Sequence, residues 1–169
     1  ENTTAFNQNI SNWCVESISP EPPDFSTNSA LTNNNKPLWG AICSSIYLDS
    51  NGITVKCDQA SVGDTGIING KEYTVVDETT LRTMVGGDED VTCVCTSLVT
   101  NTNELFEDKI SFNQDISSWD TSKVLSMSEM FYNASNFNQD ISEWNISSSI
   151  DLSYMFGGAS VFDQNISSW

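Results

Sequence analysis

The phrase FNQDISSWD, at residues 112–120, decides how this chain is organised, because it returns as FNQDISEWN at 137–145 and as FDQNISSW at 162–169. The spacing from one copy to the next is 25 residues. A fixed period of this length is typical of a solenoid, in which each small repeat buries its apolar face against its neighbours. A fourth copy, FNQNISNW at 6–13, stands outside this register.

Three aromatic positions recur in every repeat, and core packing is favoured over ligand binding as their role. Each coil would add one short strand to a parallel sheet, about 4.8 Å from the strand of the neighbouring coil, so that equivalent residues stack. Residues 128–134 suit a short helix with Ser128 as its cap. The predicted core residues are Phe106, Phe131 and Phe156, then Phe112, Phe137 and Phe162, and finally Trp119, Trp144 and Trp169.

The repeats divide the chain into four predicted segments of an α+β fold. Residues 1–13 would be the last turn of a preceding solenoid, and residues 14–45, which hold all four prolines, would form an irregular, disulfide-bounded closing cap or linker. Residues 46–95 would form a small β-rich opening cap with one short helix. Residues 96–169 would form a short solenoid of three 25-residue repeats with parallel strands.

The opening cap carries hairpin and helix signals. The pairs Asn51-Gly52 and Asn69-Gly70 each lie between β-prone stretches and suit tight turns, which are favoured over a calcium loop beginning at Asp49. The stretch 77–85, DETTLRTMV, predicts a helix that is capped by its first aspartate and ends at a Gly-Gly pair.

The five cysteines predict structural disulfides of an exported protein. A metal site is disfavoured, because the chain has no histidine and lacks paired C-x-x-C motifs. We expect Cys14 to pair with Cys43 across the closing cap. Cys57 would pair across the opening cap with Cys95 or with Cys93; if it pairs with Cys95, then Cys93 is a free or intermolecular thiol.

The net charge of −17, from 23 acidic and 6 basic residues, disfavours nucleic acid and anionic membrane surfaces as partners. No apolar run approaches the roughly 20 residues that span a bilayer, so direct membrane insertion is not expected. The chain shows no signal peptide at Glu1, which predicts a soluble mature segment or an excerpt whose export signal lies elsewhere.

Two groups of carboxylates are weak candidates for calcium, and no other cofactor is expected. Asp88, Glu89 and Asp90 form the densest acidic run, for which a solvated turn is the favoured interpretation. Asp115 and Asp140 occupy the same position of successive repeats, where capping of backbone N–H groups is favoured over a bound cation.

Catalysis is not expected. Without histidine the chain has no Ser-His or Cys-His pair, and it shows no glycine-rich phosphate loop. Asp115 and Asp140 lie at a repeated position, and no singular pair of carboxylates stands out. Glycoside hydrolysis nevertheless stays open as an alternative, because it requires only two suitably spaced carboxylates.

The stretches TSKVLSMSEMF (121–131) and MFYNASNFNQDISEWN (130–145) resemble the BspA-like leucine-rich-repeat surface proteins. The resemblance covers 96–169 and 3–13, and the intervening segments are similar to caps of such proteins in Bacteroidetes-type bacteria. It implies a leucine-rich-repeat-like solenoid at the cell surface or in the extracellular medium, with a role in adhesion or matrix contact. A glycan or a host or matrix protein would be the partner, and a glycan-binding or glycan-hydrolysing module is the alternative.

The lone phrase and the last phrase share a variant. Both read Gln-Asn-Ile-Ser, at 8–11 and 164–167, whereas the two internal copies read Gln-Asp-Ile-Ser. We therefore predict that the lone phrase ends a preceding solenoid and that the chain is one period of a tandem array, with a cysteine following Trp169. Further copies of the same module would then be partners, and such head-to-tail contacts form an extended fibre.

Overall fold

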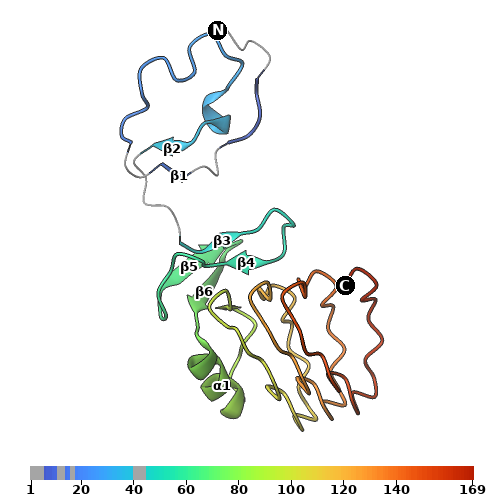
Figure 1. Ribbon diagram of the computed structural model, residues 1–169. Coiled ribbons are helices and arrows are strands. Elements are labelled where there is room, and N and C mark those ends of the chain that lie inside the picture. The colour runs from blue at the N-terminus through green and yellow to red at the C-terminus, as the bar shows by residue number, and fades with distance from the viewer. Residues whose placement is uncertain (1–5, 11–13, 16–17, 40–44) are drawn as a thin grey trace. The chain divides into compact units, whose positions relative to one another are not determined.

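The structure of the protein is a computed structural model that describes residues 6–10, 14–15, 18–39 and 45–169. The chain divides into two compact units, Glu1–Ser44 and Ser45–Trp169. Figure 1 shows the elements of both units.

The first unit is small and mostly irregular. Strand β1 (Cys14–Val15) pairs in parallel with strand β2 (Leu38–Trp39), and the short 3-10 helix η1 spans Asn33–Asn35. Phe25 packs edge-on against Trp39, with ring centroids 4.7 Å apart. Residues on both sides of the irregular stretch are therefore brought together by few but specific contacts.

The second unit begins with two hairpins, and both predicted hairpins are confirmed. The turn between β5 (Thr65–Ile68) and β6 (Lys71–Val75) places Asn69 and Gly70 at φ values of 52° and 80°, the left-handed region that asparagine and glycine tolerate best. A further strand, β7 (Val94–Cys95), pairs in parallel with β6. The strands are β3 (Tyr47–Leu48), β4 (Val55–Lys56), β5 (Thr65–Ile68), β6 (Lys71–Val75) and β7 (Val94–Cys95).

The predicted helix is also confirmed: α1 spans Glu78–Gly86. Its N-cap is Asp77, whose carboxylate accepts a hydrogen bond from the Thr80 N–H at 2.8 Å. Leu81 and Val85 are buried on one face of the helix and join the hydrophobic core of the repeats.

Residues 96–169 form three coils that lie side by side in Figure 1: the first coil is 96–120, the second 121–145 and the third 146–169. N–H groups of each coil donate to carbonyl oxygens of the next, at N–O distances between 2.6 and 3.1 Å. The pairs between the first and second coils are Thr102 with Ser126, Glu104 with Ser128, Phe106 with Met130 and Asp108 with Tyr132.

Side chains at equivalent positions of the coils stack on one another. The rings of Phe131 and Phe106 lie 5.4 Å apart, and those of Trp119 and Trp144 lie 6.3 Å apart and nearly parallel. Each indole N–H also donates to a backbone carbonyl oxygen of the preceding turn of chain, at 3.2 Å for Trp144 and the Ile116 oxygen. The buried members are Phe106, Phe131, Phe137, Trp119 and Trp144; the partly buried members are Phe112, Phe156, Phe162 and Trp169.

The short helix predicted over 128–134 is wrong, because these residues form successive turns. Glu129 and Asn133 lie in the left-handed region, with φ values of 57° and 56°. Alternate N–H groups bond within the coil and to the third coil, so they are not free for a helical ladder. The parallel contact between coils consists of single-residue bridges, Asn101 to Ser126 and Ser126 to Asp151, in place of the expected strands.

Candidate functional site

At the first coil, residues from outside the repeats make hydrogen bonds that a preceding coil would otherwise make. The guanidinium of Arg82, on α1, donates to the carbonyl oxygens of Asn103 at 3.0 Å and Asn101 at 3.4 Å. The equivalent carbonyls in the second coil, Ser126 and Ser128, accept N–H groups of the first. Arg82 therefore replaces the two backbone N–H donors that a coil before the first coil would supply.

Residues 88–91 continue this replacement, because each lies 25 positions before a residue of the first coil's FNQDISSWD phrase. The indole N–H of Trp119 donates to the Val91 oxygen at 3.0 Å, as Trp144 does to Ile116. The Gln114 amide donates to the Glu89 oxygen at 3.0 Å and accepts the N–H of Val91 at 2.8 Å. Glu89 and Val91 therefore take the place of a preceding coil beside the first repeat.

The third coil presents the opposite edge. The N–H groups that would continue the ladder are those of Leu152, Tyr154, Phe156 and Gly158. Within the described part of the chain these four N–H groups have no acceptor. Tyr154 is 73% exposed on this edge, so the coil ends in a surface with an ordered row of backbone donors.

Within the acidic run 88–90, Asp88 and Asp90 already have partners. The carboxylate of Asp88 lies 2.7 Å from the Lys109 ammonium, beside a cleft of about 460 Å³ that Glu89 also lines. Asp90 accepts the N–H of Thr92, and this hydrogen bond lowers the pKa of its carboxyl. No group of three acidic or cysteine side chains among the described residues could hold a metal ion.

Asp115 and Asp140 act at the turns of their own coils. Asp115 accepts hydrogen bonds from the N–H and hydroxyl of Ser117, at 3.1 and 2.7 Å. Asp140 accepts the N–H of Ser142 at 3.0 Å, and this bond lowers the pKa of the Asp140 carboxyl. The two aspartates therefore satisfy backbone donors.

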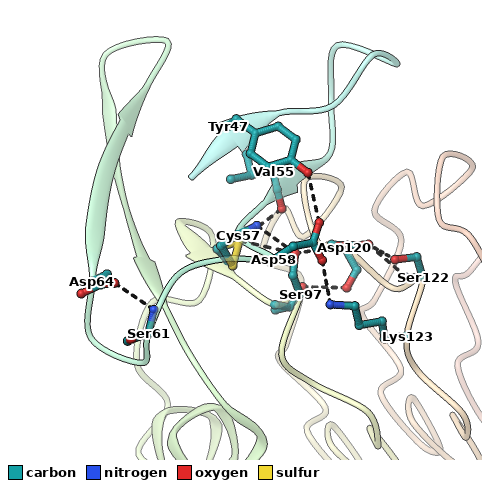
Figure 2. The surroundings of a disulfide bond; sticks show 12 residues. Tyr47, Val55, Cys57, Asp58, Ser61, Asp64, Ser97, Asp120, Ser122 and Lys123 are labelled. Atoms are coloured by element: carbon teal, nitrogen blue, oxygen red, sulfur yellow. Dashed lines mark hydrogen bonds and ion pairs between the residues drawn. A yellow bond between two sulfur atoms is a disulfide. The ribbon is translucent and has the colours of Figure 1, made fainter. Parts of the chain in front are cut away.

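One disulfide joins Cys57 to Cys95, with a Cα–Cα distance of 6.2 Å, and Cys93 is a free, partly buried thiol. The predicted Cys14–Cys43 bond involves Cys43, which lies outside the described residues. Figure 2 shows the polar contacts around Cys57. Its N–H donates to the Ser97 hydroxyl at 3.0 Å, so the bond lies where the hairpin meets the first coil.

The β3–β4 hairpin and the residues after it contact the coils through polar groups. The Val55 N–H donates to the Ser118 oxygen at 2.8 Å, and the Lys123 ammonium lies 2.7 Å from the Asp58 carboxylate. The Lys123 hydrogen bond lowers the pKa of the Asp58 carboxyl. Burial raises the pKa of Tyr47, whose hydroxyl donates to Asp58 at 3.0 Å.

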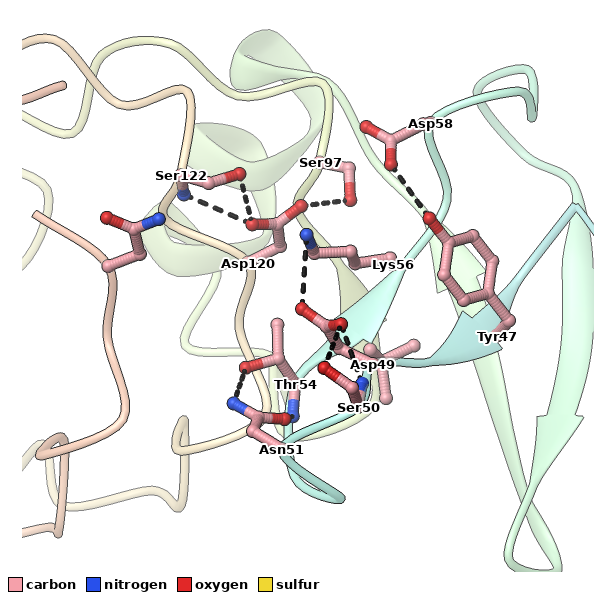
Figure 3. Close-up of polar contacts among 12 residues, drawn as sticks. Tyr47, Asp49, Ser50, Asn51, Thr54, Lys56, Asp58, Ser97, Asp120 and Ser122 are labelled. Atoms are coloured by element: carbon pink, nitrogen blue, oxygen red, sulfur yellow. Dashed lines mark hydrogen bonds and ion pairs between the residues drawn. The ribbon is translucent and has the colours of Figure 1, made fainter. Parts of the chain in front are cut away.

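A buried carboxylate lies next to this contact. Asp120 is 2% exposed and accepts hydrogen bonds from the hydroxyls of Ser97 and Ser122, both at 2.6 Å. In Figure 3 the Lys56 ammonium points into the space between Asp49 and Asp120. Its hydrogen bond to Asp49, at 3.1 Å, is the main cause of its raised pKa, and the charge of Asp120 also contributes.

The sequence had not singled out Arg82, Lys56, Asp120 or Glu143. For Glu143 a signal existed: the other two repeats carry serine at this position, Ser118 and Ser168. For Lys56 and Arg82 no repeat exists for comparison, so nothing local marks them. None of the described helices is both long and apolar enough to cross a membrane.

A protein-family model matches most of the chain. The model described as "Mycoplasma protein of unknown function, DUF285" matches residues 1–40 and 78–169, which is more than half of the chain. No curated protein and no solved structure matches the chain. The match is consistent with the resemblance to BspA-like repeat surface proteins, and it leaves out residues 41–77, which include both hairpins. The chain belongs to the family of Mycoplasma proteins of unknown function, DUF285.

Proposed function

We propose that this chain is a secreted or cell-surface repeat module with an adhesive or structural role, and that such modules join end to end into an extended fibre. Its coils would be a short leucine-rich-repeat-like solenoid, between a β-rich opening cap and an irregular closing cap. The Cys57–Cys95 disulfide and the family match support an extracellular location. A Bacteroidetes-type source remains our prediction.

The observation that carries the proposal is a shared hydrogen-bond pattern. Between coils, the Gln139 amide donates to the side-chain and backbone oxygens of Asn113, at 2.9 and 3.0 Å. In the first unit, the Asn35 amide approaches the same two oxygens of Asn7, at 2.9 and 3.5 Å. Asn7 holds in the lone phrase the position that Asn113 holds in the repeat. Asn35 therefore takes the place of a glutamine from a following coil.

This similarity supports a particular occupant for the edge of the third coil. Asp163 has the position of Asn7 in the last phrase, and its carboxylate can accept the same side-chain amide. A segment equal to residues 14–40 would then follow the last coil of each module, as it follows the lone phrase. The contact joins unlike surfaces, so it propagates and need not close.

The proposed role involves no reaction. A repetitive surface suits an extended or repetitive partner, such as an extracellular glycan, a host or matrix protein, or further copies of the module. The proposal therefore concerns binding and assembly, and it predicts no turnover of the glycans that the module contacts.

The test extends the chain after Trp169 by a second copy of residues 14–40. We expect slower amide hydrogen exchange at Leu152, Tyr154 and Phe156, because the added segment would cover the free edge. The control carries the same added residues in reversed order. Equal exchange in both extended chains would contradict the proposal, as would compact single particles of the native material in electron micrographs.

A further inference from the structure

A small polar pocket lies where the β3–β4 hairpin meets the coils. Its volume is about 180 Å³. Asp49, Asn51 and Lys56 line it from the hairpin, and Asp120, Glu143 and Asn145 line it from the coils. All belong to the second unit, and several of their side chains are drawn in Figure 3.

One wall of the pocket lies outside the family match, and the other contains a residue that departs from the repeat. The hairpin wall belongs to residues 41–77, which the family match leaves out. The coil wall contains Glu143, where the other two repeats have Ser118 and Ser168. The Glu143 carboxylate also lies 3.5 Å from the Asn51 side-chain amide. The residue that replaces serine in the second coil is therefore one that contacts the β3–β4 hairpin.

The charges of the pocket disfavour an anion, and among the described residues no three acidic side chains are grouped so that they could hold a metal ion. Asp49, Asp120 and Glu143 would repel an anion. The space between Asp49 and Asp120 already holds the ammonium of Lys56, which would repel a cation (Figure 3). A ligand of either sign therefore meets a like charge.

The same groups suit a ligand with many hydroxyls. Carboxylate oxygens at Asp49 and Glu143 accept hydrogen bonds, whereas the Lys56 ammonium and the Asn145 amide donate them. Asp120 is buried and held by two serine hydroxyls, which makes that side of the pocket rigid, while Glu143 and Asn145 are exposed to solvent. The volume is below the roughly 300–1,000 Å³ of drug-sized ligand sites, so one ring fits better than several.

We propose that this pocket binds one neutral hexose residue of an extracellular glycan. Glu143 would accept hydrogen bonds from sugar hydroxyls at the entrance, and Lys56 would donate to a ring or hydroxyl oxygen inside. This binding goes beyond end-to-end assembly and does not depend on it, because none of the pocket groups belongs to the edge of the third coil.

The test uses the full chain and saturation-transfer NMR with the methyl glycosides of glucose, galactose and mannose. We expect transfer to at least one glycoside, together with shifts of the backbone amide signals of Asn51 and Asn145. Glu143→Ser should weaken this binding by about tenfold, the effect of losing a hydrogen bond to a charged group. The variant should fold, because Ser118 and Ser168 occupy its position in the other coils.

Glu72→Ser is the matched control, since it removes an exposed carboxylate that does not line the pocket. Its affinity for the glycoside should equal that of the unaltered chain. The proposal is overturned if no glycoside gives transfer, if Glu143→Ser binds as tightly as the control, or if added calcium chloride alone shifts the same amide signals. Fibre formation is measured separately by electron microscopy, so either proposal can fail while the other stands.

Discussion

The repeat coils and the segment before them are held together in different ways. In 96–169, like side chains stack on like, and the same backbone hydrogen bonds recur from coil to coil. In 46–95, a disulfide, an ion pair to Lys123 and a guanidinium cap take over. A repeated sequence therefore distributes its stability over many equivalent contacts, whereas a unique segment depends on a few individual ones.

Among the repeated contacts, loss of the Trp144 side chain should destabilise the chain most. This residue is 3% exposed, stacks on Trp119 and donates to the Ile116 oxygen. Replacing it with alanine should lower the free energy of unfolding by about 3–5 kcal/mol, the usual cost of deleting a large buried aromatic side chain. Urea denaturation followed by circular dichroism would measure the loss.

Trp169 is the matched control, because it makes the same indole hydrogen bond, to Ile141, but is only partly buried in the third coil. Trp169→Ala should therefore cost clearly less than Trp144→Ala. Equal losses at the two positions would show that burial in the stack does not set the stability of the tryptophan column.

Loss of the individual contacts of residues 46–95 should destabilise that segment before it destabilises the coils. Reduction of Cys57–Cys95 opens a loop with a sequence separation of 38, for which chain entropy predicts a loss of about 3–4 kcal/mol. Amide protection should fall in 46–95 before it falls in the second coil, because the coil contacts do not include this bond. Hydrogen exchange with and without reductant would measure the order.

The double variant Cys57→Ser with Cys95→Ser controls for other effects of the reductant. It should show the same pattern of protection in the absence of reductant. A loss of protection that spreads evenly over 46–169 would contradict a local role for the bond.

Sequence reasoning succeeded where local signals and tertiary structure agree. Asn69-Gly70 forms its hairpin turn and Asp77 caps its helix, because each depends on a few neighbouring residues. It failed over 128–134, where the neighbouring coil offers carbonyl oxygens to Glu129 and Phe131. Those bonds compete with a helix, and no local propensity reveals them.

The candidate sites were harder to predict for a related reason. The period indicates which residues of the coils are equivalent, but it does not indicate where a segment outside the repeat will pack. Lys56 and Arg82 acquire their roles only when the hairpin and α1 meet the coils. Of these residues only Glu143 could be noticed in the sequence, because the equivalent residues of the other two repeats are Ser118 and Ser168.

A substitution at Arg82 should have a smaller effect on stability and tests whether its guanidinium caps the first coil. Arg82→Met keeps much of the side-chain volume but removes the donors to the Asn101 and Asn103 oxygens. It should lower the free energy of unfolding by about 1–2 kcal/mol. The guanidinium is partly exposed, so water competes for its hydrogen bonds and reduces their contribution to stability. Lys71→Met, which removes an exposed positive charge, is the control. If both variants unfold at the same urea concentration, the guanidinium does not cap the first coil.

The contact between Asp58 and Lys123 should make a small contribution to stability that depends on pH. The ammonium lowers the pKa of the Asp58 carboxyl below its ordinary value of about 3.9, so in acid the unfolded chain takes up the proton first. The stabilisation is therefore complete above that ordinary value and is lost as the pH falls through the lower pKa of the folded state. Because the Lys123 side chain is 47% exposed, the pair should contribute about 0.5 kcal/mol or less.

The whole chain cannot show this effect by itself, because acid also relieves the repulsion among carboxylates in a chain of net charge −17. The informative quantity is the difference in unfolding free energy between the unaltered chain and Asp58→Asn, measured from pH 7 to pH 2. Asp163→Asn serves as the control for lost charge, since asparagine occupies its position at Asn113 and Asn138. The Asp58→Asn difference should exceed the control's at neutral pH and shrink towards zero in acid; two parallel curves would mean that solvent screens the pair completely.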